Sequence, residues 1–370
     1  LTAGSINLSA SNGVTLGAVV ETNGGAFTVN ADSDANGAGT FTVQDTSIVQ
    51  QVKLAASDGV ANDYFGFSVA IDGDTLLVGA YLEDPNYTDA GSVYVFVRSG
   101  STWTQQAKLI ASDRYSYDYF GYSVALDGDT AVIGAYQEDP NGYSEAGSVY
   151  VFVRSGATWS QQAKLIASDR YYSDYFGYSV GISSDTIIVG APYEDSNGSD
   201  AGSAYVFTRT GTSWNEQAKL TASDKNSSDY FGYAVSISGD TILVGSPEDD
   251  DRGSRSGSAY VFVRTGTAWS QQAKLTASDG SSSDYFGKAL ALDGDTAIIG
   301  SSEDDDRGSR SGSAYIFTRS GAIWSEQAKL IASDGSSSDY FGYAVDIDGD
   351  MALVGAYQDD DKGSESGSAY

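Results

Sequence analysis

The chain has 370 residues and a formal net charge of −30, from 50 acidic and 20 basic side chains. So much negative charge repels phosphate backbones and anionic lipid surfaces, so we expect no nucleic acid partner. The chain contains no cysteine and no histidine. This excludes disulfides, thiol nucleophiles, imidazole bases and the usual zinc ligands, and any metal would need oxygen ligands.

The composition also bears on location. No apolar run is long enough to span a bilayer, and no basic-then-apolar signal peptide begins the chain, so we expect no membrane insertion. The 44 Gly and 4 Pro indicate many tight turns between short strands rather than disorder. An acidic, Gly-rich and Tyr-rich chain with little Lys suits the exterior of a bacterial cell, so we expect an extracellular protein, secreted or on the cell surface.

Residues 1–47 do not match the rest of the chain. They contain short alternating segments, SINLSAS, GVTLGAVV, GAFTVNA and GTFTVQD, separated by turn-forming residues. This segment resembles the β-helical coils of large secreted adhesins of the filamentous-haemagglutinin type. The alternative is an irregular β-rich leader. In either case we expect a β-rich N-terminal segment over 1–47 and a separate domain over 48–370.

A repeat of about 55 residues fills the second domain. Its marker is a Phe-Gly pair that recurs at steps of 55, 56, 55, 55 and 55 residues. The six Phe residues are Phe65, Phe120, Phe176, Phe231, Phe286 and Phe341. A partial copy, VQQVKLAASD at 49–58, aligns with the QQAKLIASD that closes each later repeat, and the sixth copy stops at Tyr370. Such regular spacing indicates one supersecondary unit used repeatedly.

Each repeat contains four predicted strands. In the second copy these are 120–126, 130–135, 148–154 and 159–168, and an Asp-Gly-Asp turn joins the first two. Four antiparallel strands in about 55 residues are typical of a propeller blade. The sequence therefore predicts an all-β fold, a β-propeller of six or seven blades. We expect pairing of the N- and C-terminal strands to close the ring, because closure removes exposed edges.

The Phe-Gly openings, each followed by VGA, IGA, VGAP, VGSP or IGS, resemble FG-GAP repeats, the blades of integrin α-subunit propellers and of many bacterial surface proteins. The resemblance covers roughly 48–370. It implies a propeller for adhesion or ligand binding that is often calcium-loaded. The calcium loop of integrin-type blades, DxDxDGxxD, is replaced here by short turns such as LDGDT, which cannot surround a cation with six or more oxygens. We therefore interpret Asp72 and Asp127 as turn formers.

Because strand direction alternates, the loops after the second and fourth strands of every copy emerge at one end, called here the loop end. Acidic residues gather there, and a rim of like charge favours a cation or a basic partner. We expect Ca²⁺ as the cation. The predicted metal ligands are Asp84, Asp139, Asp195, Asp249, Asp250, Asp251, Asp304, Asp305, Asp306, Asp359, Asp360 and Asp361. The alternative is a solvated acidic rim that keeps the protein soluble.

The loops divide the copies into two groups. Copies one to three carry Tyr, whereas copies four to six carry Asp, Arg, Gly and Ser, as in EDDDRGSRSGS. An aromatic face beside carboxylates suits a sugar ring or a peptide. The predicted ligand-binding residues are Tyr81, Tyr87, Tyr115, Tyr117, Tyr136, Tyr143, Tyr171, Tyr172 and Tyr193. Recent duplication of copies four to six would produce the same contrast.

Other repeated residues have a structural interpretation. The Trp that opens each fourth strand, such as Trp159, is predicted to pack between blades, and the repeated Lys, such as Lys164, to pair with an Asp. Paired carboxylates recur in nearly every copy, whereas an active site needs one pair with separated pKa values in one cleft. The sequence therefore predicts no enzyme.

The leading hypothesis is a non-enzymatic extracellular binding or adhesion module of a larger surface or secreted protein. It would present its acidic loops to a protein partner or a neighbouring subunit. One alternative is a carbohydrate-binding lectin that binds a glycan with its Tyr-rich sector. The other is a structural subunit of a surface layer or filament, formed by self-assembly.

Overall fold

A computed structural model describes residues 6–9, 14–16, 27–30, 41–43 and 52–370 of the chain. The chain divides into two compact units, and the boundary along the sequence lies between Leu54 and Ala55. Each unit is considered by itself.

The described residues of the first unit form four short strands. They are β1 (Ile6–Ser9), β2 (Val14–Leu16), β3 (Phe27–Asn30) and β4 (Phe41–Val43). β1 pairs with β3 and β2 pairs with β4, both in parallel. Parallel pairing is what a β-helical coil would have, but the residues between these strands lie outside the described ones. The adhesin-like coil over 1–47 therefore stays a prediction.

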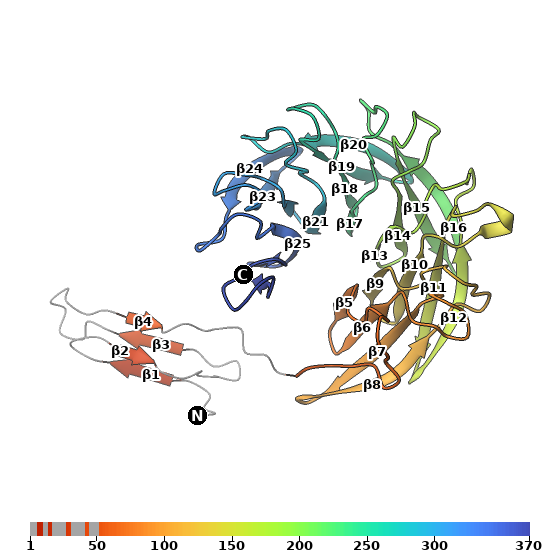
Figure 1. Cartoon of the computed structure of the whole chain (residues 1–370), viewed down its shortest axis with the longest axis horizontal. Helices are drawn as coiled ribbons and strands as arrows, with labels where there is room; N and C mark the ends of the chain where they lie inside the picture. The colour runs from red at the N-terminus through yellow and green to blue at the C-terminus, as the bar shows by residue number, and fades with distance from the viewer. Residues whose placement is uncertain (1–5, 10–13, 17–26, 31–40, 44–51) are drawn as a thin grey trace. The chain divides into compact units, whose positions relative to one another are not determined.

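The second unit consists of six antiparallel sheets, called here blades one to six (Figure 1). Blade one contains β5 (Val69–Asp72), β6 (Thr75–Ala80), β7 (Ser92–Ser99) and β8 (Thr102–Leu109). Blade two contains β9 (Ser123–Asp127), β10 (Thr130–Ala135), β11 (Ser148–Ser155) and β12 (Thr158–Leu165). Blade three contains β13 (Ser179–Ser183), β14 (Thr186–Ala191), β15 (Ser203–Thr210) and β16 (Ser213–Leu220).

The last three blades repeat this order. Blade four contains β17 (Val235–Ser238), β18 (Thr241–Ser246), β19 (Ser258–Thr265) and β20 (Ala268–Leu275). Blade five contains β21 (Ala289–Asp293), β22 (Thr296–Ser301), β23 (Ser313–Ser320) and β24 (Ile323–Leu330). Blade six contains β25 (Phe341–Asp348), β26 (Met351–Ala356) and β27 (Ser368–Ala369).

Within each blade the strands follow one another in space as they do in sequence. The first strands contact each other from blade to blade around a common axis, and the fourth strands lie on the outside (Figure 1). The all-β propeller arrangement is confirmed. In the part of the chain that the structure describes, the only helical segment is a short 3₁₀ turn at Pro140–Gly142. None of the helical structure found there is long and apolar enough to cross a membrane.

The sequence of each strand matches its place in the blade. The second strand of blade two, TAVIGA, is a continuous apolar run and is buried along its whole length, because it lies inside its sheet and between neighbouring blades. The outer strand, TWSQQAKL, alternates and is mostly half-buried. A tight turn joins the two inner strands, and its Gly128 has a φ of +55°, which glycine adopts without strain.

Two predicted strand boundaries are wrong. The first strand of blade two begins at Ser123 rather than at residue 120, because Gly121 has a φ of +92° and belongs to a turn. The fourth strand ends at Leu165 rather than at 168. Phe120 is buried and packs edge-on against Tyr150, with ring centroids 5.5 Å apart. The Phe-Gly pair therefore lies in the turn that precedes the first strand, and its Phe anchors that turn to the blade.

Closure of the ring by the terminal strands is not observed in the described residues. There, β27 pairs only with β26, so blade six has three strands. Residues 52–57, the described part of the segment that we expected to close the ring, form no strand, and 48–51 lie outside the described residues. In agreement, Val69 of blade one and Met351 of blade six are 63% and 72% exposed. Among residues 55–370, neither face has the neighbour that covers the inner blades.

Neighbouring blades approach each other most closely at glycines. A Cβ built at Gly134 of blade two would lie 2.1 Å from the carbonyl oxygen of Gly177, in the Phe-Gly pair of blade three. The corresponding separations at Gly79, Gly190, Gly245 and Gly300 are 2.0–2.2 Å. No real side chain tolerates this distance, so glycine is required wherever a blade has a following neighbour. Gly355 of blade six has no such neighbour, and its Cβ would meet only Ala344, at 3.6 Å.

We predict that Gly134→Ala lowers the free energy of unfolding by about 1–3 kcal/mol, because the blades must separate to admit the methyl group. Gly355→Ala is the matched control, since it occupies the same strand position without a facing carbonyl. It should leave the stability unchanged or slightly higher. Denaturant unfolding of both variants measures the difference. Equal losses would contradict the role assigned to the blade contact.

Candidate functional site

The loops after the second and fourth strands meet at the loop end, as the sequence predicts. Their contact is a lysine-centred network that is clearest in blade two. Lys164 on β12 places its Nζ 2.7 Å from Asp113 Oδ2, in the loop that enters blade two, and 2.8 Å from Glu138 Oε1, in the loop after β10. Tyr150 donates its hydroxyl to Asp113 Oδ1 at 2.9 Å. One ammonium thus joins two loops.

The same network recurs in the other complete blades. Its members are Lys108 with Asp58 and Glu83, Lys219 with Asp169 and Glu194, Lys274 with Asp224 and Asp249, and Lys329 with Asp279 and Asp304. Burial alone would raise the pKa of Asp113, but hydrogen bonds from Lys164 and Tyr150 outweigh it and hold this pKa below its ordinary value. Asp113 therefore stays ionised, and the predicted pairing of the repeated Lys is confirmed.

The structure gives the twelve predicted metal ligands different partners. Asp249, Asp304 and Asp359 are buried and accept a tyrosine hydroxyl. Asp251 and Asp306 contact the lysines of blades four and five. Asp84, Asp139, Asp195 and Asp250 each accept a backbone N–H from five or six residues further on, at 2.7–2.8 Å, and so shape their own loops. Asp305, Asp360 and Asp361 are exposed.

Eight carboxylates of the network, five Asp and three Glu, were not among the predicted site residues. Glu83, Glu138 and Glu194 occupy the position that Asp249 holds in blade four, and each pairs through a carboxylate oxygen with the ammonium of the lysine of its blade. The signal was present, because the fourth residue after the glycine of the second strand is Glu or Asp in every copy. Aligning the Glu-Asp pairs of the copies with one another hides this equivalence, because it places Glu83 opposite Glu248 rather than opposite Asp249.

One carboxylate cluster has the geometry to hold a metal. Oxygens of Asp224, Asp249 and Asp251 lie within 4.8 Å of one another. These are hard oxygen donors of the kind that calcium prefers. However, Lys274 contacts all three carboxylates with its Nζ. The arrangement as built fits an ammonium group rather than Ca²⁺, and calcium binding stays a prediction.

Blade six lacks this cation within the described residues. There Tyr370 donates its hydroxyl to Asp334 at 2.9 Å and to Asp359 at 2.6 Å, but no lysine forms a salt bridge with either carboxylate. Repulsion from Asp359 and Asp334 raises the pKa of Asp361. Within the described residues, Asp334 and Asp359 therefore have the tyrosine of the network as a partner but not its lysine.

Three of the predicted tyrosines lie in one aromatic belt at the loop end of the inner strands. Ring centroids that are 4.4–5.7 Å apart connect its members from blade one to blade four. The belt consists of Tyr64, Phe67, Tyr81, Tyr119, Tyr122, Tyr136, Tyr175, Tyr178, Tyr193, Tyr230 and Tyr233. Of these, only Tyr81, Tyr136 and Tyr193 were predicted, although the repeated YFGY pattern marks most of the others.

The remaining predicted tyrosines lie on outer loops. Tyr143 contacts Tyr171 and Tyr172, with centroids 6.5 and 5.3 Å away. Tyr87 pairs with Tyr115 at 5.4 Å. Tyr117 is half exposed on the loop that also carries Tyr115. The structure thus brings the nine residues together as a belt and two small clusters rather than as one site.

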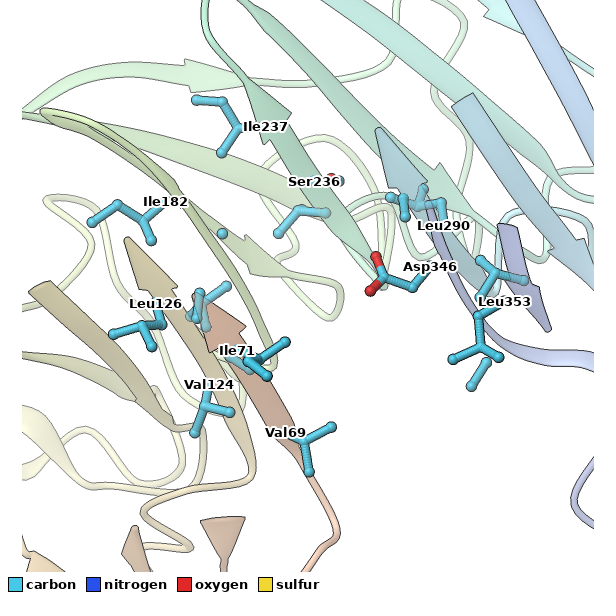
Figure 2. A pocket seen from close by; sticks show the side chains of 18 of the residues that line it. Val69, Ile71, Val124, Leu126, Ile182, Ser236, Ile237, Leu290, Asp346 and Leu353 are labelled. Carbon is cyan, nitrogen blue, oxygen red and sulfur yellow. The ribbon is translucent and has the colours of Figure 1, made fainter. Parts of the chain in front are cut away.

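A central cavity runs along the axis inside the first strands (Figure 2). It has a volume of about 640 Å³, and most of the side chains that line it are apolar. Val124, Leu126, Ile182 and Ile237 are among the side chains that line it, and Asp346 is its one ionisable group. A wall of this kind offers no paired acid and base, so the cavity does not resemble a catalytic site.

The loops that enter blades two and three each carry a second Asp, whose pKa is raised rather than lowered. Asp118 is 5% exposed and accepts the backbone N–H of Tyr115 at 2.5 Å. Burial raises the pKa of Asp118 to about 7, and the charge of Glu138 adds to the effect. The same burial raises the pKa of Asp174 to about 7.

We predict that Asp118→Asn makes the protein more stable than the unsubstituted chain at pH 8, by about 1–2 kcal/mol after allowance for solvent screening. Because the folded-state pKa is raised, the contribution of Asp118 is present below about pH 4 and is lost as the pH rises through about 7. Asn keeps the acceptor but cannot ionise. Urea unfolding between pH 5 and 8 measures the change.

Asp113→Asn is the control, because the pKa of Asp113 is lowered and the sign reverses. This variant should lose stability at pH 7, and the loss should fade as the pH falls below the ordinary value of an aspartate. Two variants with the same pH dependence would contradict the assignment.

Comparison with known families agrees with this architecture. The sequence model of the FG-GAP repeat family matches residues 48–96, 103–152, 159–207, 214–262, 269–317 and 324–370, which is more than half of the chain. No curated protein matches the sequence. FG-GAP repeats are found in adhesion and extracellular proteins, and propellers of this kind are typically non-catalytic. The chain belongs to the FG-GAP repeat family.

Proposed function

We propose that the chain is a non-enzymatic binding module of a bacterial surface or secreted protein, and that it presents its acidic loop end to a protein partner. The supporting observation is a contrast between the buried contacts of the blades and their loops at the loop end. The blades share their buried contacts, including the network of Lys164, Asp113 and Tyr150, whereas their loops differ in aromatic, acidic and basic side chains. Variation confined to one end is what recognition requires of a repeat.

The charge of the loop end indicates a basic partner. Lysine neutralises the carboxylates of the network, but Asp305 and Asp360 form no salt bridge within the described residues and face solvent. With a net charge of −30, the protein attracts a positive surface and orients it during approach. The occurrence of the family in adhesion and extracellular proteins supports the location outside the cell.

The pattern of perturbed carboxylates argues against an enzyme. Burial raises the pKa of Asp118 and Asp174 to about 7, and that of Asp229 and Asp284 to about 6. These residues occupy one equivalent position in four successive blades. A catalytic acid would be set apart from its copies, so the shifts reflect the construction of the blade.

We predict that the double variant Asp305→Asn, Asp360→Asn binds its partner with an association rate about threefold to tenfold lower. Purified extracellular matrix and cell-surface proteins serve as probes, and surface plasmon resonance at low and physiological salt gives the rates. The matched control is Asp129→Asn, Asp185→Asn, which removes the same charge at the opposite end, where both acids are 65% exposed. Equal effects of the two variants, or binding to none of the probes, would refute the proposal.

Calcium is a separate part of the proposal. We expect it to enter the cluster of Asp224, Asp249 and Asp251 only when the competing ammonium is removed, since both cations use the same oxygens. Lys274→Gln should therefore gain one calcium site and a higher melting temperature in calcium. Lys225→Gln is the control, because Lys225 contacts Asn197 and no carboxylate. Calorimetry that shows the same calcium uptake in all three proteins would contradict this competition.

A second candidate function, a structural subunit of a surface layer or filament, is favoured by the exposed apolar faces of blades one and six. These carry Val69, Ile71, Met351 and Leu353. Contact between blade one of one copy and blade six of the next is heterologous, so it would build an open array. Light scattering of the same preparations distinguishes the candidates, because a mass that rises with concentration indicates assembly and a constant monomer mass indicates a binding module.

A further inference from the structure

A small pocket opens at the loop end between blades three, four and five. Its volume is about 220 Å³. Its walls are Tyr230, Tyr233 and Tyr285, with Glu248 and Lys288 at its polar side, and Pro247 and Tyr193 complete the lining. No predicted ligand-binding residue other than Tyr193 belongs to it.

The pocket exists because blade four lacks a ring that blade two has. The second residue after the glycine of the second strand is Tyr136 in blade two and Pro247 in blade four. The ring of Tyr136 lies between two pairs of aromatic residues, with centroids 5.7 and 4.4 Å from Tyr119 and Tyr122 of its own blade. Tyr175 and Tyr178 of the next blade lie 5.3 and 5.6 Å away on the other side.

The residues around Pro247 are the equivalents of these four. Tyr230 and Tyr233 correspond to the pair of the same blade, and Tyr285 and Lys288 to the pair of the next. A proline is too small to fill the space that a tyrosine ring fills in blade two. The repeat therefore shows directly which shape the pocket accepts, a six-membered aromatic ring held between aromatic walls.

We propose that this pocket binds an aromatic side chain of the partner protein, and that tyrosine is the ring that fits it best. The inference rests on the proposed protein-binding function and names the group that is recognised. A ring in this position would contact Tyr230 and Tyr233 on one side and Tyr285 on the other. Buried aromatic anchors of this kind supply most of the affinity at protein interfaces.

The polar side of the pocket suits a phenol. Glu248 offers carboxylate oxygens as acceptors and Lys288 offers an ammonium as donor. Arg255 Nε lies 3.3 Å from Glu248 Oε2, and Arg255 Nη1 donates to the hydroxyl of Tyr285 at 3.1 Å. Arg255 thus connects two residues of the pocket wall to each other. Burial raises the pKa of Tyr193 to about 12, and this phenol stays neutral at physiological pH. The ligand thus meets polar groups at its edge and rings at its faces.

The location also agrees with a protein ligand. The pocket carries its own basic residues, Lys288 and Arg255, within an acidic rim, so it does not select for positive charge itself. The rim would attract the basic surface of the partner, and the pocket would take an uncharged ring from that surface. The two features together specify an aromatic residue flanked by Lys or Arg.

The experiment uses lysine-flanked peptides that contain Tyr, Phe or Ala at the centre, with isothermal titration calorimetry on the purified chain. The Tyr peptide should bind about tenfold more tightly than the Ala peptide. Pro247→Tyr should abolish this preference, because the chain's own ring then fills the pocket as Tyr136 fills its site in blade two. Melting temperatures of the variant and the unsubstituted chain verify that the fold is retained.

Lys288→Tyr distinguishes the proposal from sugar binding. It restores the aromatic residue that the other blades have after Phe-Gly, such as Tyr233, and removes the ammonium. Lys288→Tyr should narrow the advantage of the Tyr peptide over the Phe peptide, because the phenol loses its ammonium donor, but both peptides should still bind more tightly than the Ala peptide. Binding of an acidic sugar on a glycan array would be lost altogether. A preference for Tyr that Pro247→Tyr leaves intact, or glycan binding without any peptide preference, would overturn the inference.

The outcome is separable from that of the proposed function. If Asp305→Asn, Asp360→Asn weakens partner binding while Pro247→Tyr has no effect on it, the module binds proteins through its loop end without this pocket, and the inference alone fails. If no protein binds but the Tyr peptide does, the pocket is real and the proposed function fails.

Discussion

The contact between a glycine of one blade and the Phe-Gly carbonyl of the next determines much of this structure. At Gly134 the space for a Cβ is only 2.1 Å from Gly177 O, so the backbones are as close as sterics allow. The carbonyl can reach that position because Gly177 itself has a φ of +93°. Two glycines from different repeats therefore set the spacing of the blades, and the apolar side chains between them pack at a fixed distance.

The lysine network adds an electrostatic link to this steric one. Because Lys164 bonds to Asp113 in the loop that enters its blade and to Glu138 in its own second loop, it couples the end of one repeat to the next. Glu138 retains little exposure, and an unpaired charge there would be costly. The same cation also neutralises carboxylates whose oxygens are of the kind that calcium prefers. The acidic loops of this chain thus have a structural role, and the proposed recognition would use the acids outside the network.

The sequence allowed the repeat, its four strands and the roles of Trp159 and Lys164 to be predicted, because each depends on local periodicity or on a residue that recurs in every copy. Trp159 indeed donates to Gln106 of the preceding blade at 3.0 Å. The candidate site could not be predicted to the same extent. Paired acids look alike in sequence, and only packing separates the buried Asp249 from the exposed Asp250. Closure by the terminal strands stays a prediction, because residues 48–51 of the expected closing segment lie outside the described residues.

Repetition also explains where a binding site can arise. A glycine at a blade contact cannot be replaced in one copy without forcing two blades apart. This constraint is the same for every repeat that has a following neighbour. A ring in the aromatic belt is under a weaker constraint, because it lies at the mouth of the axis and borders solvent. Replacing it by Pro247, with Lys288 beside it, removes local packing but leaves the blade contacts intact. A propeller of near-identical blades can therefore acquire a pocket by losing one side chain, in a region where such a loss costs little stability.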